Sequence, residues 1–277
     1  MGQPVIADAF RRFKHRRRTA RALAEIATRP DRPRKPHGLP SELIVSLTSH
    51  APRFATLAPT LRAILRQTVQ PDRVILWLDE GDDDRLSPDI QGMAGLEVRI
   101  CQNWRSYKKI VPTLLNHPHA YVVTADDDVY YPHDWLERLV TAAQQGARVA
   151  CLRAHQVMLS APGRPAPYED WRHNLAEPQS GPLVFPTGVS GVLYAPDSLH
   201  PDVTRPDLFQ RLAPGADDVW LYWMHRMGGS RPCKIGGRAR IVEWDGSQVV
   251  NLRAGNRQGN GNDRAVAALL DRYGWPD

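Results

Sequence analysis

The chain has 277 residues, 24 of them proline and 20 glycine, with a formal net charge of +6. This length suits one large α/β domain or two small ones and allows a core of ordinary size. No apolar run approaches the ~20 residues of a membrane-spanning helix, and the N-terminus lacks the continuous apolar stretch of a secretory signal. Three widely spaced cysteines without a CxxC pair exclude a disulfide framework. We therefore expect a cytoplasmic protein.

The positive charge is concentrated at the N-terminus. Residues 1–40 contain nine Arg and two Lys against three acids, which gives +8, so the rest of the chain sums to −2. An enzyme acting on nucleic acid is expected to carry its basic surface near its site. The sequence therefore predicts no nucleic-acid partner.

The N-terminal region is predicted to be separate from the main domain. Residues 5–27 predict a basic helix, which could lie on an anionic membrane surface, pack on the domain, or form a frayed tail. Residues 29–40 are rich in proline and basic residues and predict a linker. We expect a basic helix and linker over residues 1–40 and one domain over residues 41–277.

Strands and helices alternate along this domain. Short apolar runs predict strands and longer amphipathic segments predict helices. The alternation implies an α/β fold with a mainly parallel sheet and right-handed crossovers. The expected strands are residues 42–49, 73–78, 96–101, 121–125 and 148–152, and the expected helices are about 57–67, one opening at Tyr107, 134–145, one from near Asp217, and 264–272; residues 153–185 are predicted to be irregular and 251–264 a polar loop.

The apolar strand 121–125 stops abruptly at three acids, Asp126, Asp127 and Asp128. In open α/β sheets, ligands bind outside the carboxyl ends of the strands. Mutual repulsion of the three carboxylates calls for an opposing charge, and a hard divalent cation shared with substrate phosphates would supply it. The pattern favours a metal–nucleotide site over a solvated acidic turn. A second acidic run, residues 79–84, is expected to be an exposed loop and ranks below it.

Four segments stand out by their residue types and order. They are residues 46–53 (SLTSHAPR), 106–112 (SYKKIVP), 124–132 (TADDDVYYP) and 215–220 (GADDVW). Together they resemble the nucleotide-sugar glycosyltransferases of the GT-A fold, most closely the bacterial family-2-type enzymes of surface-polysaccharide assembly. The resemblance implies a Rossmann-like, mixed but mainly parallel sheet flanked by helices.

The resemblance also implies roles for individual residues. Asp126 and Asp128 match the DxD spacing of the family and are the implied site for Mn²⁺ or Mg²⁺, with Asp126 or Asp127 facing the ribose or the water shell of the metal. The metal would bridge the diphosphate and neutralise the leaving group. For Lys108 and Lys109, a position on a solvated helix face is an equal alternative to diphosphate binding. The other implied donor-binding residues are Thr48, Ser49 and Arg53 for the nucleotide, Asp79 for the base, Lys108 or Lys109 for the diphosphate, and Gly188 and Gly191 for close approach to the sugar.

Asp217 and Asp218 open a predicted helix. An acid in this position usually caps the helix or complements its dipole. By family analogy, one of the two is the general base that takes the proton of an acceptor hydroxyl, with inversion at the anomeric carbon. The sequence does not choose between them, and it gives no role to Asn262 and Asp263.

The implied activity is metal-dependent transfer of a sugar from a nucleoside-diphosphate donor, with UDP-sugar favoured, to a glycan or lipid-linked acceptor. A peripheral contact with the inner membrane face through residues 5–27 would fit such an acceptor. Relatives often have a late metal-ligating histidine, whereas the last one here, His225, lies within a predicted helix. Phosphate, water or Asn251 would then complete the coordination. The alternatives are a sugar nucleotidyltransferase, disfavoured because residues 46–53 lack glycine, and a non-catalytic membrane-associated adaptor.

Overall fold

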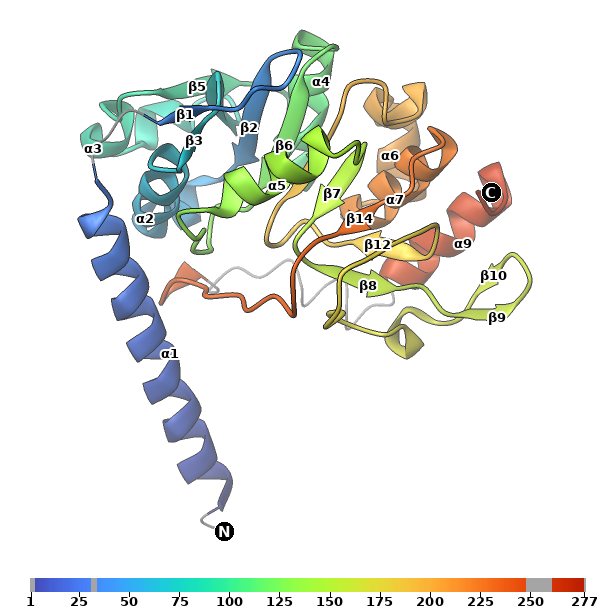
Figure 1. Cartoon of the computed structure of the whole chain (residues 1–277), viewed down its shortest axis with the longest axis horizontal. Coiled ribbons are helices and arrows are strands. Elements are labelled where there is room, and N and C mark those ends of the chain that lie inside the picture. Colours follow the sequence, from blue (N-terminus) through green and yellow to red (C-terminus); the bar gives the residue numbers. More distant parts are fainter. Residues whose placement is uncertain (1–2, 31–33, 248–260, 277) are drawn as a thin grey trace.

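The computed structural model describes residues 3–30, 34–247 and 261–276 (Figure 1). Its centre is a sheet of eight strands. They are β2 (Leu43–Thr48), β4 (Arg73–Leu78), β5 (Leu96–Ile100), β6 (Tyr121–Ala125), β7 (Val149–Cys151), β11 (Gln179–Ser180), β13 (Val192–Tyr194) and β14 (Cys233–Lys234).

The strand order in this sheet is β11-β14-β7-β13-β6-β2-β4-β5. Strands β5, β4, β2 and β6 run parallel, β14 is parallel to β7, and β13 lies antiparallel between β6 and β7. The predicted mixed, mainly parallel sheet is therefore confirmed. Because β2 lies between β4 and β6, the carboxyl ends of these three strands meet at one edge.

Helices cover both faces of the sheet. Successive strand residues alternate between two buried clusters: Ile44 and Val122 pack on one side, and Val45 and Val123 on the other. Burial on both faces explains why these strands are continuous apolar runs rather than alternating ones. The helices are α2 (Phe54–Leu65), α3 (Pro88–Gln91) and α5 (Trp135–Gln144) on one side, and α4 (Val111–Asn116), α6 (Pro206–Leu212), α7 (Asp217–Met227) and α9 (Gly261–Tyr273) on the other.

Some local predictions were wrong. Residues 153–185 are not irregular throughout, because their prolines occupy strand ends and turns, where a missing N–H is tolerated. They contain β8 (Ala154–Gln156), β9 (Leu159–Ala161), β10 (Arg164–Pro165) and β11, and β8 pairs with β12 (Val184–Pro186). Helix α6 was not predicted, and Lys108 and Lys109 end the 3-10 helix η3 (Arg105–Lys109) instead of opening α4. Most of the predicted loop 251–264 lies outside the described residues.

The basic N-terminal helix α1 (Gln3–Thr28) is longer than predicted and extends away from the rest of the chain (Figure 1). Its last turns pack on the domain, where Ala22 and Ile26 are buried with residues of α2, and His15 Nε2 lies 3.0 Å from Asp245 Oδ1. Arg29 then donates hydrogen bonds of 2.6 Å to the carbonyls of Ala63 and Tyr131. Beyond it, β1 (Lys35–Pro36) pairs with β3 (Val69–Gln70). No helix among the described residues is long and apolar enough to cross a membrane.

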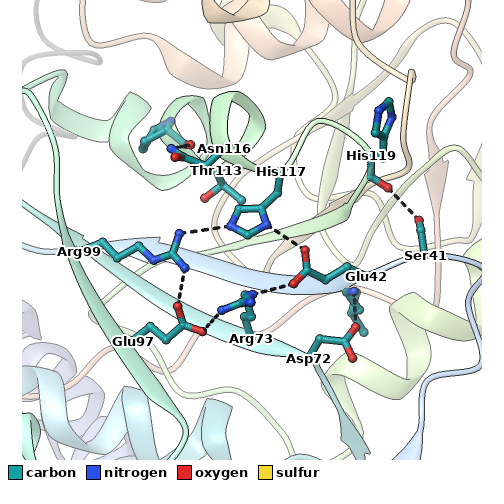
Figure 2. A network of polar contacts seen from close by, with 12 residues as sticks. Ser41, Glu42, Asp72, Arg73, Glu97, Arg99, Thr113, Asn116, His117 and His119 are labelled. Atoms are coloured by element: carbon teal, nitrogen blue, oxygen red, sulfur yellow. Dashed lines mark hydrogen bonds and ion pairs between the residues drawn. The ribbon is translucent and has the colours of Figure 1, made fainter.

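A closed ring of charged side chains lies near the amino ends of the parallel strands (Figure 2). Glu42 pairs with Arg73 at 2.6 Å, Arg73 with Glu97 at 2.6 Å, and Glu97 with Arg99 at 2.6 Å. His117 completes the ring, with Nε2 3.2 Å from Arg99 and Nδ1 2.8 Å from Glu42. These contacts assign the neutral tautomer protonated on Nδ1, because Nε2 faces an N–H donor. The ring fastens the start of β2 to β4, β5 and α4.

Candidate active site

The carboxyl ends of the central strands open into a cavity of about 570 Å³. It brings together most of the residues singled out in the sequence. Those that line it are Thr48, Ser49, Arg53, Asp79, Lys108, Lys109, Asp126, Asp127, Asp128, Gly188, Asp217 and Asp218.

The middle acid of the triple is held by the protein itself. Asp127 accepts hydrogen bonds from Ser49 Oγ to Oδ2 and from Arg53 Nη1 to Oδ1, both at 2.6 Å. The same Arg53 nitrogen lies 3.1 Å from Asp128 Oδ2. Burial opposes the charge of Arg53, but Asp127 and Asp128 outweigh it and raise the pKa of the guanidinium. The buried Asp127 thus positions the loop, while the side chains of Asp126 and Asp128 are 26% and 12% exposed.

Lys109 connects the strand-end acids with helix α7. Its Nζ lies 3.2 Å from Asp126 Oδ1 and 2.8 Å from Asp217 Oδ2. Burial alone would lower the pKa of this lysine, but Asp126, Asp217 and Asp218 hold it well above its usual value. Ser106 Oγ donates a second hydrogen bond to Asp217, at 2.9 Å to Oδ1. The Asp217 carboxylate is therefore held between a cation and a hydroxyl.

The two adjacent lysines have different partners. Lys108 Nζ lies 2.7 Å from Asp79 Oδ1, at the end of β4, and both side chains line the cavity. Thr48 is anchored nearby by a 2.8 Å hydrogen bond from its hydroxyl to the Trp77 carbonyl. Neither lysine lies on a solvated helix face, because both side chains are buried. Lys108 thus lies at the Asp79 end of the cavity and Lys109 at the Asp126 end.

Asp218 has a different environment from its neighbour. Its Oδ1 accepts a 2.9 Å hydrogen bond from the backbone N–H of Gly188. Burial and the nearby charge of Asp217 raise the pKa of Asp218 to about 7. Neither acid caps α7, whose N-cap is Ala216 and has no side-chain hydrogen bond. Two adjacent carboxylates with such different environments are typical of an acid–base pair.

Gly188 and Gly191 have different structural roles. A Cβ on Gly188 would lie 2.8 Å from Lys109 Nζ and 3.0 Å from Asp218 Oδ1, so only glycine lets these groups approach. Gly191 has φ +87° and packs under Trp135, whose ring would lie 2.5 Å from an added Cβ. Trp135 also donates a 2.8 Å hydrogen bond to the carbonyl of Ser190. Gly188 lines the cavity, and Gly191 shapes the turn behind it.

A further wall of the cavity was not predicted from the sequence. It is formed by Arg153, His155, Tyr168 and His173 from the proline-rich segment, with Asn262 from α9. These residues are far apart in sequence and follow no motif. Long-range contacts bring them to the cavity, such as the pairing of β8 with β12 and the hydrogen bond from the Tyr168 N–H to Asp263, and no local sequence pattern indicates such contacts.

Other candidates lie elsewhere. The aromatic residues Trp220, Tyr222 and Trp223 of α7 are at most 1% exposed and belong to the core, so they do not line the cavity. His225 is fully buried beside Tyr222, and burial lowers its pKa to about 3, so it is neutral and takes no part in the cavity. The acidic run after Asp79 lies in a partly exposed turn and 3-10 helix, η2 (Asp83–Arg85). Asn251 lies outside the described residues.

Two carboxylates of the cavity could bind a divalent cation. Asp126 and Asp128 offer the hard oxygens that Mn²⁺ and Mg²⁺ prefer. Within the part of the chain that the structure describes, however, no group of three His, Cys, Asp or Glu side chains is arranged to hold a metal ion. Arg53 and Lys109 already supply part of the opposing charge. The residues fit a cation whose coordination is completed by phosphate oxygens and water.

Comparison with known proteins agrees with this geometry. Residues 51–179 match the family model for glycosyl transferase family 2. The match contains Arg53, Asp79, both lysines and the triple Asp, and it ends before α7. No curated protein matches the chain. The match favours a glycosyltransferase over the nucleotidyltransferase and adaptor alternatives, and the mixed, mainly parallel sheet agrees with the predicted GT-A fold. Residues 51–179 are thus similar to glycosyl transferase family 2, and the protein is a glycosyltransferase.

Proposed function

We propose that the protein transfers a sugar from a nucleoside-diphosphate donor, with UDP-sugar favoured, to a hydroxyl of a glycan or lipid-linked acceptor, with inversion. The observation that carries this proposal is the separation of roles between Asp217 and Asp218. Asp217 pairs with Lys109 and accepts a hydrogen bond from Ser106, whereas Asp218 has a pKa of about 7 and receives one backbone hydrogen bond. A general base works best when its pKa is near the working pH. Asp218 is thus the proposed base, and Asp217 a positioning residue.

The proposed reaction is a single displacement. Asp218 takes the proton of the acceptor hydroxyl while the oxygen attacks the anomeric carbon. The bond from that carbon to the diphosphate breaks, and the nucleoside diphosphate leaves with the electron pair. Attack opposite to the leaving group inverts the anomeric centre. Lys109 would stabilise negative charge that develops on the departing diphosphate, since electrostatic stabilisation in a water-poor cavity is strong.

The proposed donor site follows the strand ends. Asp79 would accept a hydrogen bond from the base, with Lys108 fixing its carboxylate at 2.7 Å. Thr48, Ser49 and Arg53 would hold the nucleotide, and Gly188 would admit the sugar. A divalent cation at Asp126 and Asp128 would neutralise the diphosphate charge.

Thermal unfolding with and without nucleotide tests the donor and metal site. Ligand that binds only the folded state raises the melting temperature. We expect UDP to raise it only with Mg²⁺ or Mn²⁺ present, and Asp128→Asn to remove the shift. Asp84→Asn, which changes an exposed acid of the η2 turn, is the control and should keep the shift. A nucleotide shift that survives in Asp128→Asn would refute the metal site.

The acceptor is proposed to be presented at the inner face of a bacterial membrane, for assembly of a surface polysaccharide. Phe10 and Phe13 on α1 are 55% and 56% exposed, and the surrounding turns carry Lys14, Arg16, Arg17 and Arg18. Apolar and basic side chains together suit the surface of an anionic bilayer. The protein would then be cytoplasmic and peripheral on the membrane.

A further inference from the structure

The wall formed by Arg153, His155, Tyr168 and His173 differs in charge from the rest of the cavity. All six acids that line the cavity come from strand ends β4 and β6 and from helix α7. Residues 153–187 contribute an arginine, two imidazoles and a phenol to the lining, but no acid. The donor half of the cavity is therefore rich in carboxylates, and this wall is neutral to basic.

The aromatic rings of the wall are held in place from behind. The Tyr168 ring centroid lies 4.8 Å from that of Trp171 and 5.3 Å from that of His173. The Tyr168 backbone N–H donates to Asp263 Oδ1 at 2.8 Å, which ties the segment to α9. His155 Nδ1 accepts a 3.0 Å hydrogen bond from the Asn174 N–H, which fixes the orientation of this buried ring. A rigid aromatic surface with nearby donors is typical of a site for a ring-shaped polar ligand.

Arg153 is linked to the proposed base through two neighbouring residues. Its Nη1 donates a 2.8 Å hydrogen bond to Thr187 Oγ1. The next residue, Gly188, donates its N–H to Asp218. The guanidinium therefore lines the same cavity as the base and is fixed to the same turn. Guanidinium is the side-chain group best matched to carboxylate and phosphate.

Resting on the proposed function, we propose that this wall is the acceptor site and that the acceptor is a sugar carrying an anionic group, a carboxylate or a phosphate. The sugar ring lies against Tyr168 and His173, and the anionic group pairs with Arg153. A hydroxyl of the same sugar then faces Asp218.

Binding of three small sugars tests this assignment. The probes are methyl β-glucoside, methyl β-glucuronide and glucose 1-phosphate, which compare a neutral, a carboxylate and a phosphate form. Their binding is measured by saturation-transfer NMR in the presence of Mg²⁺ and saturating UDP, so that the donor site is filled. We expect at least one anionic probe to bind about tenfold tighter than the neutral one. The preferred probe then distinguishes carboxylate from phosphate.

Substitutions distinguish the contact of the anionic group with Arg153 from the contact of the sugar ring with Tyr168. Arg153→Gln should remove most of the preference for the anionic probe, and Arg153→Lys should restore part of it. Tyr168→Ala should weaken all three probes. Arg164→Gln, on the exposed β9–β10 hairpin, is the matched control and should change nothing. All of these variants should keep the UDP-dependent rise in melting temperature.

The outcomes distinguish this proposal from the proposed function. If nucleotide binds but neutral and anionic probes bind equally, or if Arg153→Gln keeps the preference, the acceptor assignment is overturned and the donor site stands. If no nucleoside diphosphate from a panel of UDP, GDP, CDP and dTDP binds, the proposed function fails.

Discussion

Lys109 Nζ lies 2.8 Å from Asp217 Oδ2, and this contact joins the turn before α4 to the first turn of α7. The same nitrogen lies 3.2 Å from Asp126, which follows β6. One buried ammonium thus connects three segments at the cavity. Removing one partner of a buried pair leaves the other charge uncompensated.

We expect Lys109→Met to lower the free energy of unfolding by about 3–5 kcal/mol, the usual cost of breaking a buried ion pair. Urea unfolding measures this loss. Lys35→Met, which removes an exposed pair with Glu137, is the control and should cost less than about 1 kcal/mol. Adding Asp217→Asn to Lys109→Met should recover part of the loss. Equal losses of unfolding free energy in Lys109→Met and Lys35→Met would show that the buried contacts of Lys109 do not stabilise the fold more than an exposed ion pair does.

The assignment of the base predicts different kinetics for the two acids of α7. Losing a general base costs about 10²–10⁴-fold in rate. Asp218→Asn should therefore abolish most sugar transfer while UDP still raises the melting temperature. Asp217→Asn should lower the rate less, since the amide oxygen can keep one of the two contacts, with Lys109 or with Ser106. A larger rate loss in Asp217→Asn would reverse the two roles.

Transfer should depend on pH through Asp218. The base must be ionised, and its pKa is raised to about 7. The kcat of the wild type should fall as pH drops below about 7. A pH–rate profile between pH 5 and 9 measures this limb. A rate that stays constant down to pH 5 would contradict the assignment.

The same raised pKa predicts a cost in stability. Because the folded state binds the Asp218 proton more tightly than the unfolded state, the free energy of unfolding falls as pH rises from about 4 to about 7. Asparagine resembles the protonated acid, so Asp218→Asn should gain stability relative to wild type at pH 8 and lose that advantage near pH 4. Urea unfolding at both pH values checks the sign.

Features that depend on local sequence patterns were predicted well, and features that depend on long-range contacts were not. Strands β2, β4 and β6 were predicted closely, because runs buried on both faces consist of apolar residues. The triple Asp was placed correctly at a strand end for the same reason. The contacts of Arg53 and Lys109 with these acids could not be predicted, because the two cations approach the triple Asp only through the fold.

The wall containing Tyr168 and His173 could not be predicted. Its residues reach the cavity through long-range contacts, among them the pairing of β8 with β12. No periodic pattern in the sequence predicts such contacts. The sequence also could not show which of Asp217 and Asp218 is the proposed base. The two adjacent acids differ only in the distant residues that they contact, Lys109 and Gly188.

The charged ring near the amino ends of the strands should contribute to stability and not to activity. Arg73 makes two of its contacts, and its side chain is 38% exposed. Partly exposed pairs contribute at most about 1 kcal/mol each. Arg73→Gln should therefore lower the free energy of unfolding only slightly, as measured by urea unfolding, and leave kcat unchanged. A loss of transfer without a loss of stability would show that this end of the sheet affects the active site.

The basic helix predicts salt-dependent binding to anionic membranes. Each basic residue near such a surface adds about 1 kcal/mol at most, and salt screens the attraction. Because Arg29 is buried in the domain, deletion through residue 38 would damage the fold, so charge reversal is the cleaner test. We expect Arg16→Glu/Arg17→Glu/Arg18→Glu to release the protein from phosphatidylserine vesicles at low salt and to keep its nucleotide-dependent melting shift. Phe13→Ser should weaken the binding through loss of apolar contact.

Arginine-to-glutamate substitutions at Arg62, Arg85 and Arg211 are the control, because they make the same change in net charge away from α1. Vesicle sedimentation across a salt series measures the effect. If wild-type protein does not sediment with these vesicles even at low salt, or if the control triple variant is released equally, α1 does not bind membranes.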